Sequence, residues 1–291
     1  MFKGSIVALI TPFKNNKVDY DKLAELIEWH IGQGTSGIVP CGTTGESATL
    51  SHQEHKDVIK FTVDACKKRI PVIAGTGSNN TVEALELTEF AEKTGADGAL
   101  LITPYYNRPT QEGLYRHFKI IAENTKIPLV LYNVPSRTGV NMLPATIARL
   151  AGFKNVVAVK EASGSIDQSV EIIQSTAGRV KVLSGDDSLF LPIMAVGGDG
   201  VISVVANVVP KDTRSLYDSF VAGDLAKAKE LHYKLFPLIK AMFIETNPIP
   251  VKAALRLMGR INEEIRLPMC EPAAATLEKL KAAMKEYGGL I

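Results

Sequence analysis

The stretch "NVVAVKEAS" (155–163) places four consecutive apolar residues, three of them valine, directly before Lys160. Valine is β-branched and favours a pleated, enclosed strand. The ammonium group of a lysine is costly to bury without a partner. Lys160 therefore either lies at a solvated end of this strand, or its nitrogen is needed inside the protein.

Seven further apolar runs resemble this one and alternate with segments of helical periodicity. The eight runs lie at 4–10, 36–41, 70–75, 98–103, 128–133, 156–160, 180–184 and 200–205. Among the helical segments, 19–34 carries an apolar stripe. Ser51 and Glu54 have the S-x-x-E spacing of a capping box at the start of another helix. Strands that alternate with helices are parallel and joined by crossovers.

Eight such strands predict an α/β fold with a closed (β/α)8 TIM barrel, and an open doubly wound sheet is the alternative. The open sheet usually carries G-x-G-x-x-G after its first strand, where this chain has "ITPFKNNKVD" (10–19). We expect the barrel domain over residues 1–222. Residues 223–291 contain no further strand pattern and are predicted to form a C-terminal extension of three helices.

Composition narrows the function classes. The 291 residues carry a net charge of +2 without a basic block, so neither nucleic acid nor a membrane is an expected partner. Cys41, Cys66 and Cys270 are far apart and odd in number, which argues against a disulfide framework and fits the cytoplasm. His52 and His55 lie one helical turn apart but outside an H-E-x-x-H motif, so we expect no metal and no other cofactor.

Polar and reactive side chains follow several of the predicted strands. Lys160 ends the sixth strand, and Tyr132 has the corresponding place on the fifth. Threonines follow the second strand in "CGTTGES" (41–47), and tyrosines follow the fourth in "TPYYNRPTQ" (103–111). Active sites of barrels lie at the carboxyl ends of the strands. We therefore expect these groups to meet at one end of the barrel.

Each of these features also has an ordinary structural interpretation. A lysine that ends a strand is usually solvated, and Tyr132 can cap the core with its hydroxyl in water. The segment 42–47 can be a tight turn only. Asp186 and Asp187 are interpreted as a helix N-cap and a first-turn charge, not as catalytic acids.

The position at a barrel mouth favours a chemical interpretation of Lys160. Burial among apolar groups shifts a lysine towards its neutral form. A neutral amine can attack a ketone and form a Schiff base, and a neighbouring phenol such as Tyr132 can move the protons. The pair predicts a class I aldolase or a related lyase.

Six motifs in this order resemble the dihydrodipicolinate synthase family, also called 4-hydroxy-tetrahydrodipicolinate synthases, over essentially the whole chain. They are "GTTGES" (42–47), "PYYNRPTQEGLY" (104–115), "YNVPSRTG" (132–139), "VKEASG" (159–164), "LSGDD" (183–187) and "GVISV" (200–204). The resemblance implies that pyruvate and L-aspartate 4-semialdehyde are condensed in diaminopimelate and L-lysine biosynthesis.

The resemblance also implies a role for each catalytic residue. Lys160 is the nucleophile that forms a covalent imine with pyruvate, and Tyr132 donates and accepts protons. Thr43 links Tyr132 to Tyr106, which is contributed by a neighbouring subunit. The family is commonly a homotetramer built as a dimer of dimers, so we expect a homo-oligomer.

Four further positions are implied to bind substrate. Thr44 holds the pyruvate carboxylate together with Thr43, an oxyanion-type role. Arg137 grips the carboxylate of the semialdehyde with its planar fork. The backbone at Gly185 and Ile202 lines the pocket near the lysine.

Synthases of this family that L-lysine inhibits are similar to this chain at eight positions. These are Ser47, Ala48, Leu50, His52, His55, Asn79, Glu83 and Tyr105. The resemblance thus implies allosteric feedback inhibition by L-lysine at a subunit interface. Glu83 is suited to the α-ammonium group, and neutral His52 and His55 to the ε-ammonium group. Without the resemblance, the two histidines are interpreted as surface residues.

Two alternatives remain open from the sequence. A sister enzyme, N-acetylneuraminate lyase or a ketodeoxy-sugar-acid aldolase, would share the lysine and the tyrosine. Arg137 and the adjacent pair Tyr105 and Tyr106 favour the synthase. A non-catalytic protein that binds a keto acid belongs to a different class, and the complete set of reactive residues argues against it.

Overall fold

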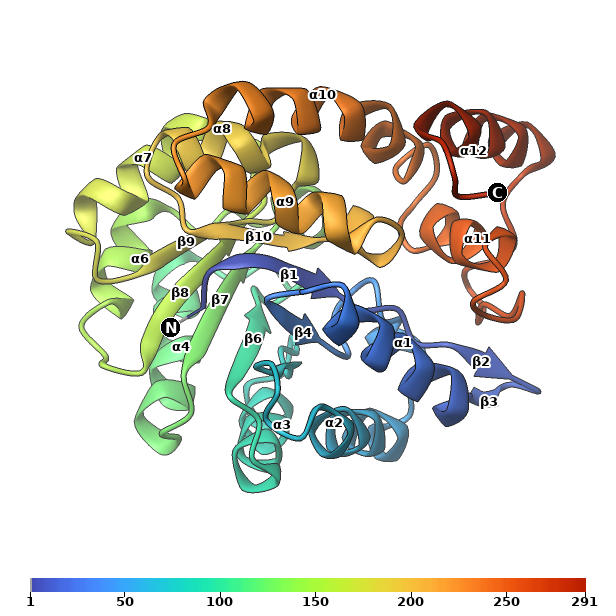
Figure 1. Ribbon diagram of the computed structural model, residues 1–291. Coiled ribbons are helices and arrows are strands. Elements are labelled where there is room, and N and C mark those ends of the chain that lie inside the picture. The colour runs from blue at the N-terminus through green and yellow to red at the C-terminus, as the bar shows by residue number, and fades with distance from the viewer. Residues whose placement is uncertain (1) are drawn as a thin grey trace.

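Eight parallel strands form the barrel at the centre of the computed structural model, which describes residues 2–291 (Figure 1). They are β1 (Gly4–Ala8), β4 (Gly37–Val39), β5 (Ile73–Gly75), β6 (Gly98–Ile102), β7 (Leu129–Asn133), β8 (Val156–Glu161), β9 (Lys181–Ser184) and β10 (Gly200–Ser203). β1 pairs with both β4 and β10, and a parallel bridge between Ile38 and Val72 joins β4 to the chain just before β5. The predicted TIM barrel is confirmed.

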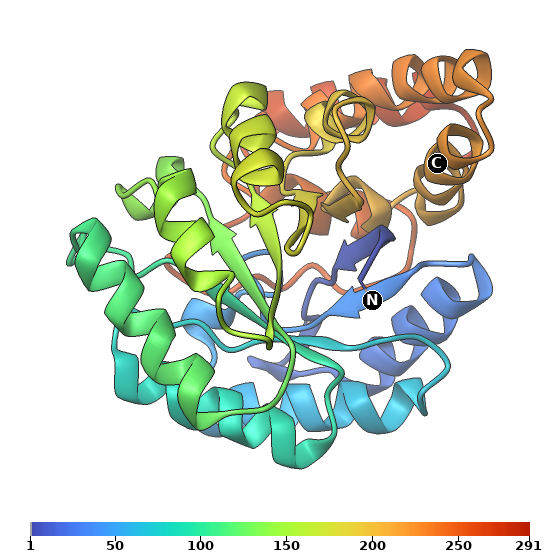
Figure 2. The same ribbon diagram turned by 90° about the vertical axis from the view of Figure 1, so that its left-hand side faces the viewer.

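Helices enclose the strands (Figure 2). Up to the last strand they are α1 (Tyr20–Gly32), α2 (His52–Cys66), α3 (Thr81–Thr94), α4 (Gln111–Asn124), α5 (Pro135–Thr138), α6 (Pro144–Leu150), α7 (Ile166–Ser175) and α8 (Phe190–Ala195). Three 3₁₀ turns, η1 (Ser47–Thr49), η2 (Asp187–Leu189) and η3 (Val205–Asn207), lie in loops that follow strands. The capping box predicted for α2 is present, because the Ser51 hydroxyl accepts from the Glu54 amide and the Glu54 carboxylate accepts from the Ser51 amide.

The strand β8 does not alternate evenly along its length. In its register with β7, Leu129 faces Val156 and Val130 faces Ala158, so Val157 is an extra residue. Such a bulge reverses the alternation on one side of the irregularity. Ala158 lies in the barrel interior, whereas Val156 packs in the layer between strands and helices. Simple alternation along the sequence predicts that Val156, Ala158 and Lys160 share one face, and for Val156 this prediction is wrong.

The segment between β1 and α1 holds a short antiparallel hairpin that the apolar pattern does not predict. Its strands are β2 (Phe13–Lys14) and β3 (Lys17–Val18). Asn15 and Asn16 at its tip both have left-handed backbone conformations, with φ of 53° and 57°. Asparagine tolerates that conformation better than most residues, which suits a two-residue hairpin turn.

The C-terminal part of the chain adds helices that pack against one side of the barrel. After α9 (Pro210–Val221) come α10 (Leu225–Ala241), α11 (Ile249–Leu257) and α12 (Ala274–Tyr287). α10 lies over α8 and α9, and α11 and α12 lie beside each other (Figure 1). The division into residues 1–222 and 223–291 stays a prediction. No helix within residues 2–291 has the length and hydropathy that crossing a membrane requires.

Candidate active site

Lys160 lies at the carboxyl end of β8 and is buried, with an exposed fraction of only 6% for the residue. Gly185, at the end of β9, makes room for it. A Cβ atom on Gly185 would lie 3.1 Å from both Cγ and Cε of Lys160 and 2.6 Å from Cβ of Ala162. Burial lowers the pKa of Lys160 to about 8; Asp187 opposes this shift and Arg137 adds to it.

Tyr132 stands beside Lys160 on the neighbouring strand. The two residues are register partners in β7 and β8, and Nζ of Lys160 lies 4.3 Å from the centroid of the Tyr132 ring. Tyr132 is also buried, which raises its pKa to about 12 against the effects of Arg137 and the Thr43 hydroxyl. The phenol is therefore protonated at neutral pH and can donate its proton.

Thr44 and Arg137 are connected through a residue of the C-terminal part of the chain. The buried Thr44 hydroxyl accepts a hydrogen bond of 3.0 Å from Nδ2 of Asn247. The Asn247 carbonyl accepts one of 3.1 Å from Nη2 of Arg137. Because the Thr44 oxygen is an acceptor in this bond, its own hydroxyl hydrogen is free to donate to a ligand. The position of Asn247 could not be found from any local motif.

Two adjoining cavities meet at these residues. One has a volume of about 310 Å³ and is lined by Lys160, Tyr132, Thr43, Thr44, Arg137, Gly185 and others. The other has a volume of about 420 Å³ and is lined by Ser47, Ala48, Leu50, His52, His55, Glu83, Tyr105 and others. Thr43, Tyr132, Arg137 and Asn247 line both. The structure thus groups most of the predicted substrate residues in the first cavity and most of the predicted inhibitor residues in the second.

Three predicted residues lie outside the cavities. Ile202 is packed in the barrel interior, and Val204, two residues later, lines the first cavity instead. Asn79 lies next to the second cavity and donates to the carbonyl of Tyr105 over 3.2 Å. Tyr106 is 91% exposed and lines neither cavity. The prediction that Tyr106 enters the active site of a neighbouring subunit requires an oligomer, and it stays a prediction.

The two histidines differ in their surroundings. His52 is exposed, with Nε2 3.9 Å from Oε1 of Glu83. His55 is buried, so its interpretation as a surface residue is wrong, and its Nε2 lies 2.7 Å from the carbonyl of Gly75. A carbonyl only accepts, which means that Nε2 of His55 carries a hydrogen and donates. Burial lowers the pKa of His55, which favours its neutral form.

Asp187 has buried contacts that the sequence interpretation does not include. Asp186 is an N-cap and Asp187 is a first-turn charge, both as predicted, and the Asp186 carboxylate accepts from the Ser188 amide. Asp187, however, is buried, and its Oδ2 accepts from the amides of Val204 and Val205 at 2.9 Å each. Burial raises the pKa of Asp187, and the hydrogen bonds that its carboxylate accepts oppose this shift. In its ionised form Asp187 raises the pKa of Lys160. These contacts form because the loops after β9 and β10 lie against each other. The local sequence "SGDDS" (184–188) does not predict that contact.

A family model described as the dihydrodipicolinate synthetase family matches residues 1–287. The chain belongs to the dihydrodipicolinate synthetase family. The 4-hydroxy-tetrahydrodipicolinate synthase of Syntrophus aciditrophicus is 58% identical to it over 288 residues, which are 99% of each chain. Relatives with this name are lyases, and this member of the dihydrodipicolinate synthetase family is a lyase too.

Solved structures in the family have the same fold. Dihydrodipicolinate synthase from Acinetobacter baumannii, in a chloride-inhibited form complexed with pyruvate, is 49% identical, with a TM-score of 0.97 over 99% of each chain. The enzyme from Cyanidioschyzon merolae with lysine bound is 40% identical, with a TM-score of 0.97 over 100% of this chain and 99% of that one. Among residues 2–291 of this family member, no three His, Cys, Asp or Glu side chains are grouped to hold a metal ion.

The charges around Lys160 predict opposite effects of two substitutions on its pKa. Asp187→Asn removes a negative charge that stabilises the ammonium, so the pKa of Lys160 should fall below about 8. Arg137→Ala removes a positive charge that destabilises it, so the pKa should rise. Both values can be measured by NMR titration of protein carrying ¹³Cε-lysine, with the Lys160 signal assigned by its loss in Lys160→Ala. Shifts of the same sign in both variants would contradict this electrostatic account.

Proposed function

We propose that the protein is a 4-hydroxy-tetrahydrodipicolinate synthase that condenses pyruvate with L-aspartate 4-semialdehyde in diaminopimelate and L-lysine biosynthesis. The observation that carries this proposal is the buried Lys160 beside Tyr132 at the carboxyl end of the barrel, in a chain whose relatives bear that name. The family member from Acinetobacter baumannii that is complexed with pyruvate supports pyruvate as the first substrate.

The first half-reaction begins at the Lys160 amine. With a pKa of about 8, a useful fraction of this amine is neutral near neutral pH. It attacks the ketone carbon of pyruvate and forms a C–N bond. The ketone oxygen takes up protons, for which the Tyr132 phenol is the adjacent donor, and leaves as water. The resulting iminium is an electron sink that makes the methyl hydrogens of pyruvate acidic.

Pyruvate is oriented by its carboxylate. The Thr44 hydroxyl has its hydrogen free, because its oxygen already accepts from Asn247. Thr43 lines the same cavity and stands next to it in the loop after β4. Hydroxyl and amide donors at this loop can hold the carboxylate while the ketone carbon faces Lys160.

The second half-reaction joins the two substrates. Loss of a methyl proton from the iminium gives an enamine, whose carbon attacks the aldehyde carbon of the semialdehyde and forms a C–C bond. The amino group of the semialdehyde can then attack the imine carbon, which closes a six-membered ring and releases Lys160. Arg137 is exposed at the mouth of the first cavity and is suited to the carboxylate of the semialdehyde. Tyr106 of a neighbouring subunit would complete the proton relay in a homotetramer.

The second cavity is proposed to bind L-lysine as a feedback inhibitor. Glu83 lies on its wall and can pair with an ammonium group. His55 is buried and its Nε2 is occupied by Gly75, which leaves Nδ1 as the acceptor of the neutral ring. Asn79 does not line the cavity but donates a hydrogen bond to the Tyr105 carbonyl, and so it contributes to lysine binding indirectly, by positioning Tyr105. The lysine-bound family member from Cyanidioschyzon merolae supports this assignment.

The Schiff base is tested by borohydride reduction in the presence of pyruvate, with the adduct located by mass spectrometry. We expect the adduct on Lys160, and its loss together with most turnover in Lys160→Ala. Lys154→Ala, which removes an exposed lysine just before the same strand, is the control and should react normally. Adduct formed at full yield in Lys160→Ala would contradict the proposal. Turnover with N-acetylmannosamine in place of the semialdehyde would instead indicate a sister aldolase.

Inhibition is tested by titrating L-lysine against the enzyme with both substrates saturating. We expect activity to fall, and Glu83→Ala to remove the inhibition while turnover is retained, because a carboxylate on the cavity wall is lost. Glu86→Ala is the matched control, since Glu86 is exposed on the same helix and does not line the cavity. Undiminished activity with no lysine binding by calorimetry would overturn the regulatory site.

A further inference from the structure

A second buried lysine connects the C-terminal part of the chain to the loop that follows β4. Lys252, on α11, and Glu46, in that loop, are each only 4% exposed. Nζ of Lys252 lies 2.5 Å from Oε1 of Glu46 and 3.1 Å from the carbonyl of Thr11. Unlike Lys160, Lys252 thus has a carboxylate partner inside the protein.

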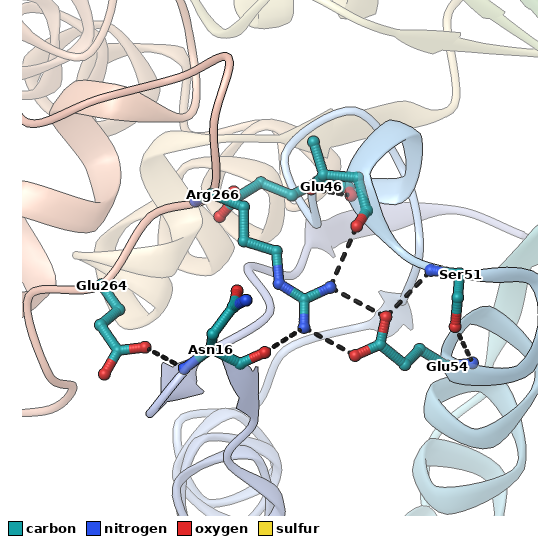
Figure 3. Close-up of polar contacts among 7 residues, drawn as sticks. Asn16, Glu46, Ser51, Glu54, Glu264 and Arg266 are labelled. Atoms are coloured by element: carbon teal, nitrogen blue, oxygen red, sulfur yellow. Dashed lines mark hydrogen bonds and ion pairs between the residues drawn. The ribbon is translucent and has the colours of Figure 1, made fainter.

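Arg266 provides a second connection to the same loop. Its backbone amide donates to Oε2 of Glu46 over 3.1 Å, and its Nη1 donates to the carbonyl of Thr49 over 3.0 Å. Its guanidinium also makes a two-pronged contact with the Glu54 carboxylate, at 2.9 and 2.6 Å (Figure 3). The hydrogen bond from Arg266 lowers the pKa of Glu54 to about 2.

The β2–β3 hairpin also contacts Arg266 and its neighbour Glu264. Nη2 of Arg266 donates to the carbonyl of Asn16 over 2.7 Å, and Glu264 accepts from the Asn16 amide over 2.8 Å (Figure 3). The guanidinium also lies over the Phe13 ring, 4.2 Å from its centroid. Residues more than two hundred positions apart are therefore fixed against one another around the Glu46 carboxylate.

The backbone conformation of Glu46 is one that its surroundings must stabilise. Its φ is 53°, a left-handed conformation that is uncommon for a residue with a Cβ. Such a conformation persists when the surrounding structure fixes it. Glu46 lies two residues after Thr44, which lines the first cavity, and directly before the η1 turn, whose residues line the second.

A buried ion pair contributes little to stability compared with a well-packed neutral pair, because both charges must be removed from water. A contribution to the position of the loop is a better account of this one, since both oxygens of Glu46 are held from different segments. We infer that Glu46 is a positioning residue, and that Lys252 and Arg266 hold its carboxylate so that the 42–50 loop presents Thr43 and Thr44 to pyruvate. This inference rests on the proposed function.

The test uses the full chain and separates position from stability. Glu46→Gln and Lys252→Met each leave one buried charge without its partner, so each single variant should unfold at a lower temperature. The double variant removes both charges at similar volume, and its melting temperature should return close to that of the unsubstituted protein. If Glu46 positions the loop, the double variant should remain slow despite its restored stability. It should form the borohydride-trapped pyruvate adduct about tenfold to a hundredfold more slowly than the unsubstituted protein does.

A second measurement does not depend on activity. Amide hydrogen exchange, read by mass spectrometry, should be faster within residues 42–50 of the double variant and unchanged in the peptides that cover β7 and β8. Lys281→Met is the matched control, because it breaks the surface pair with Glu278 in the same C-terminal part of the chain. It should change neither the exchange of residues 42–50 nor the rate of adduct formation.

A double variant with normal adduct formation and normal exchange in 42–50 would overturn the inference and leave the pair with a structural role only. If the double variant does not fold, Lys252→Met alone replaces it, because it removes the side chain that binds Oε1 of Glu46. Measured below its melting temperature, it should exchange faster in 42–50, and unchanged exchange would contradict the inference. If the unsubstituted protein forms no adduct, the proposed function fails, and hydrogen exchange still decides whether Lys252 and Arg266 hold the loop.

Discussion

The proposed chemistry of this protein depends on the burial of one lysine that has no partner of opposite charge in contact with it. Lys160 lies inside the end of the barrel, where loss of water lowers its pKa to about 8. Within residues 2–291 no carboxylate forms an ion pair with it, and Asp187 acts only through its charge nearby. In the proposed mechanism, this loss of hydration makes the Lys160 amine available as a nucleophile, which a solvated lysine with an ordinary pKa is not.

Comparison with Lys252 shows that burial alone does not make a lysine reactive. Both residues are almost fully buried, and burial lowers the pKa of both. For Lys252, the Glu46 carboxylate opposes this lowering of the pKa and accepts a hydrogen bond from the ammonium group. The same residue type therefore has two settings in one chain: Lys160 lies beside the Tyr132 ring without an ion-pair partner and is the proposed nucleophile, whereas Lys252 forms an ion pair with a carboxylate.

Local patterns in the sequence were sufficient for the barrel and for the central pair of the site. Apolar runs alternating with helical segments predicted the eight strands, and the position of Lys160 and Tyr132 at strand ends predicted that they would meet. The capping box at Ser51 was also confirmed, because both of its partners lie within one turn. The bulge at Val157 was missed, since a single extra residue leaves no signature in an apolar run.

The parts that could not be predicted are contacts between distant segments. Asn247 reaches Thr44 across 203 positions, and Lys252 reaches Glu46 across 206. Asp187 is the first-turn charge that was predicted. Its burial was not predicted, because only the folded barrel brings the loop after β10 over it. Periodicity and motif spacing describe neighbours along the chain, so they identify the reactive groups but not the residues that hold them in place.

The central claim, that burial makes Lys160 a nucleophile, is tested most directly by the pH dependence of imine formation with pyruvate. The rate constant, measured with the unsubstituted protein by rapid quenching into borohydride, should rise with pH and level off above a midpoint near the Lys160 pKa of about 8. A rate constant that continued to rise through the ordinary pKa range of lysine, about 10.4, would show that the amine is not shifted by burial and would contradict the account.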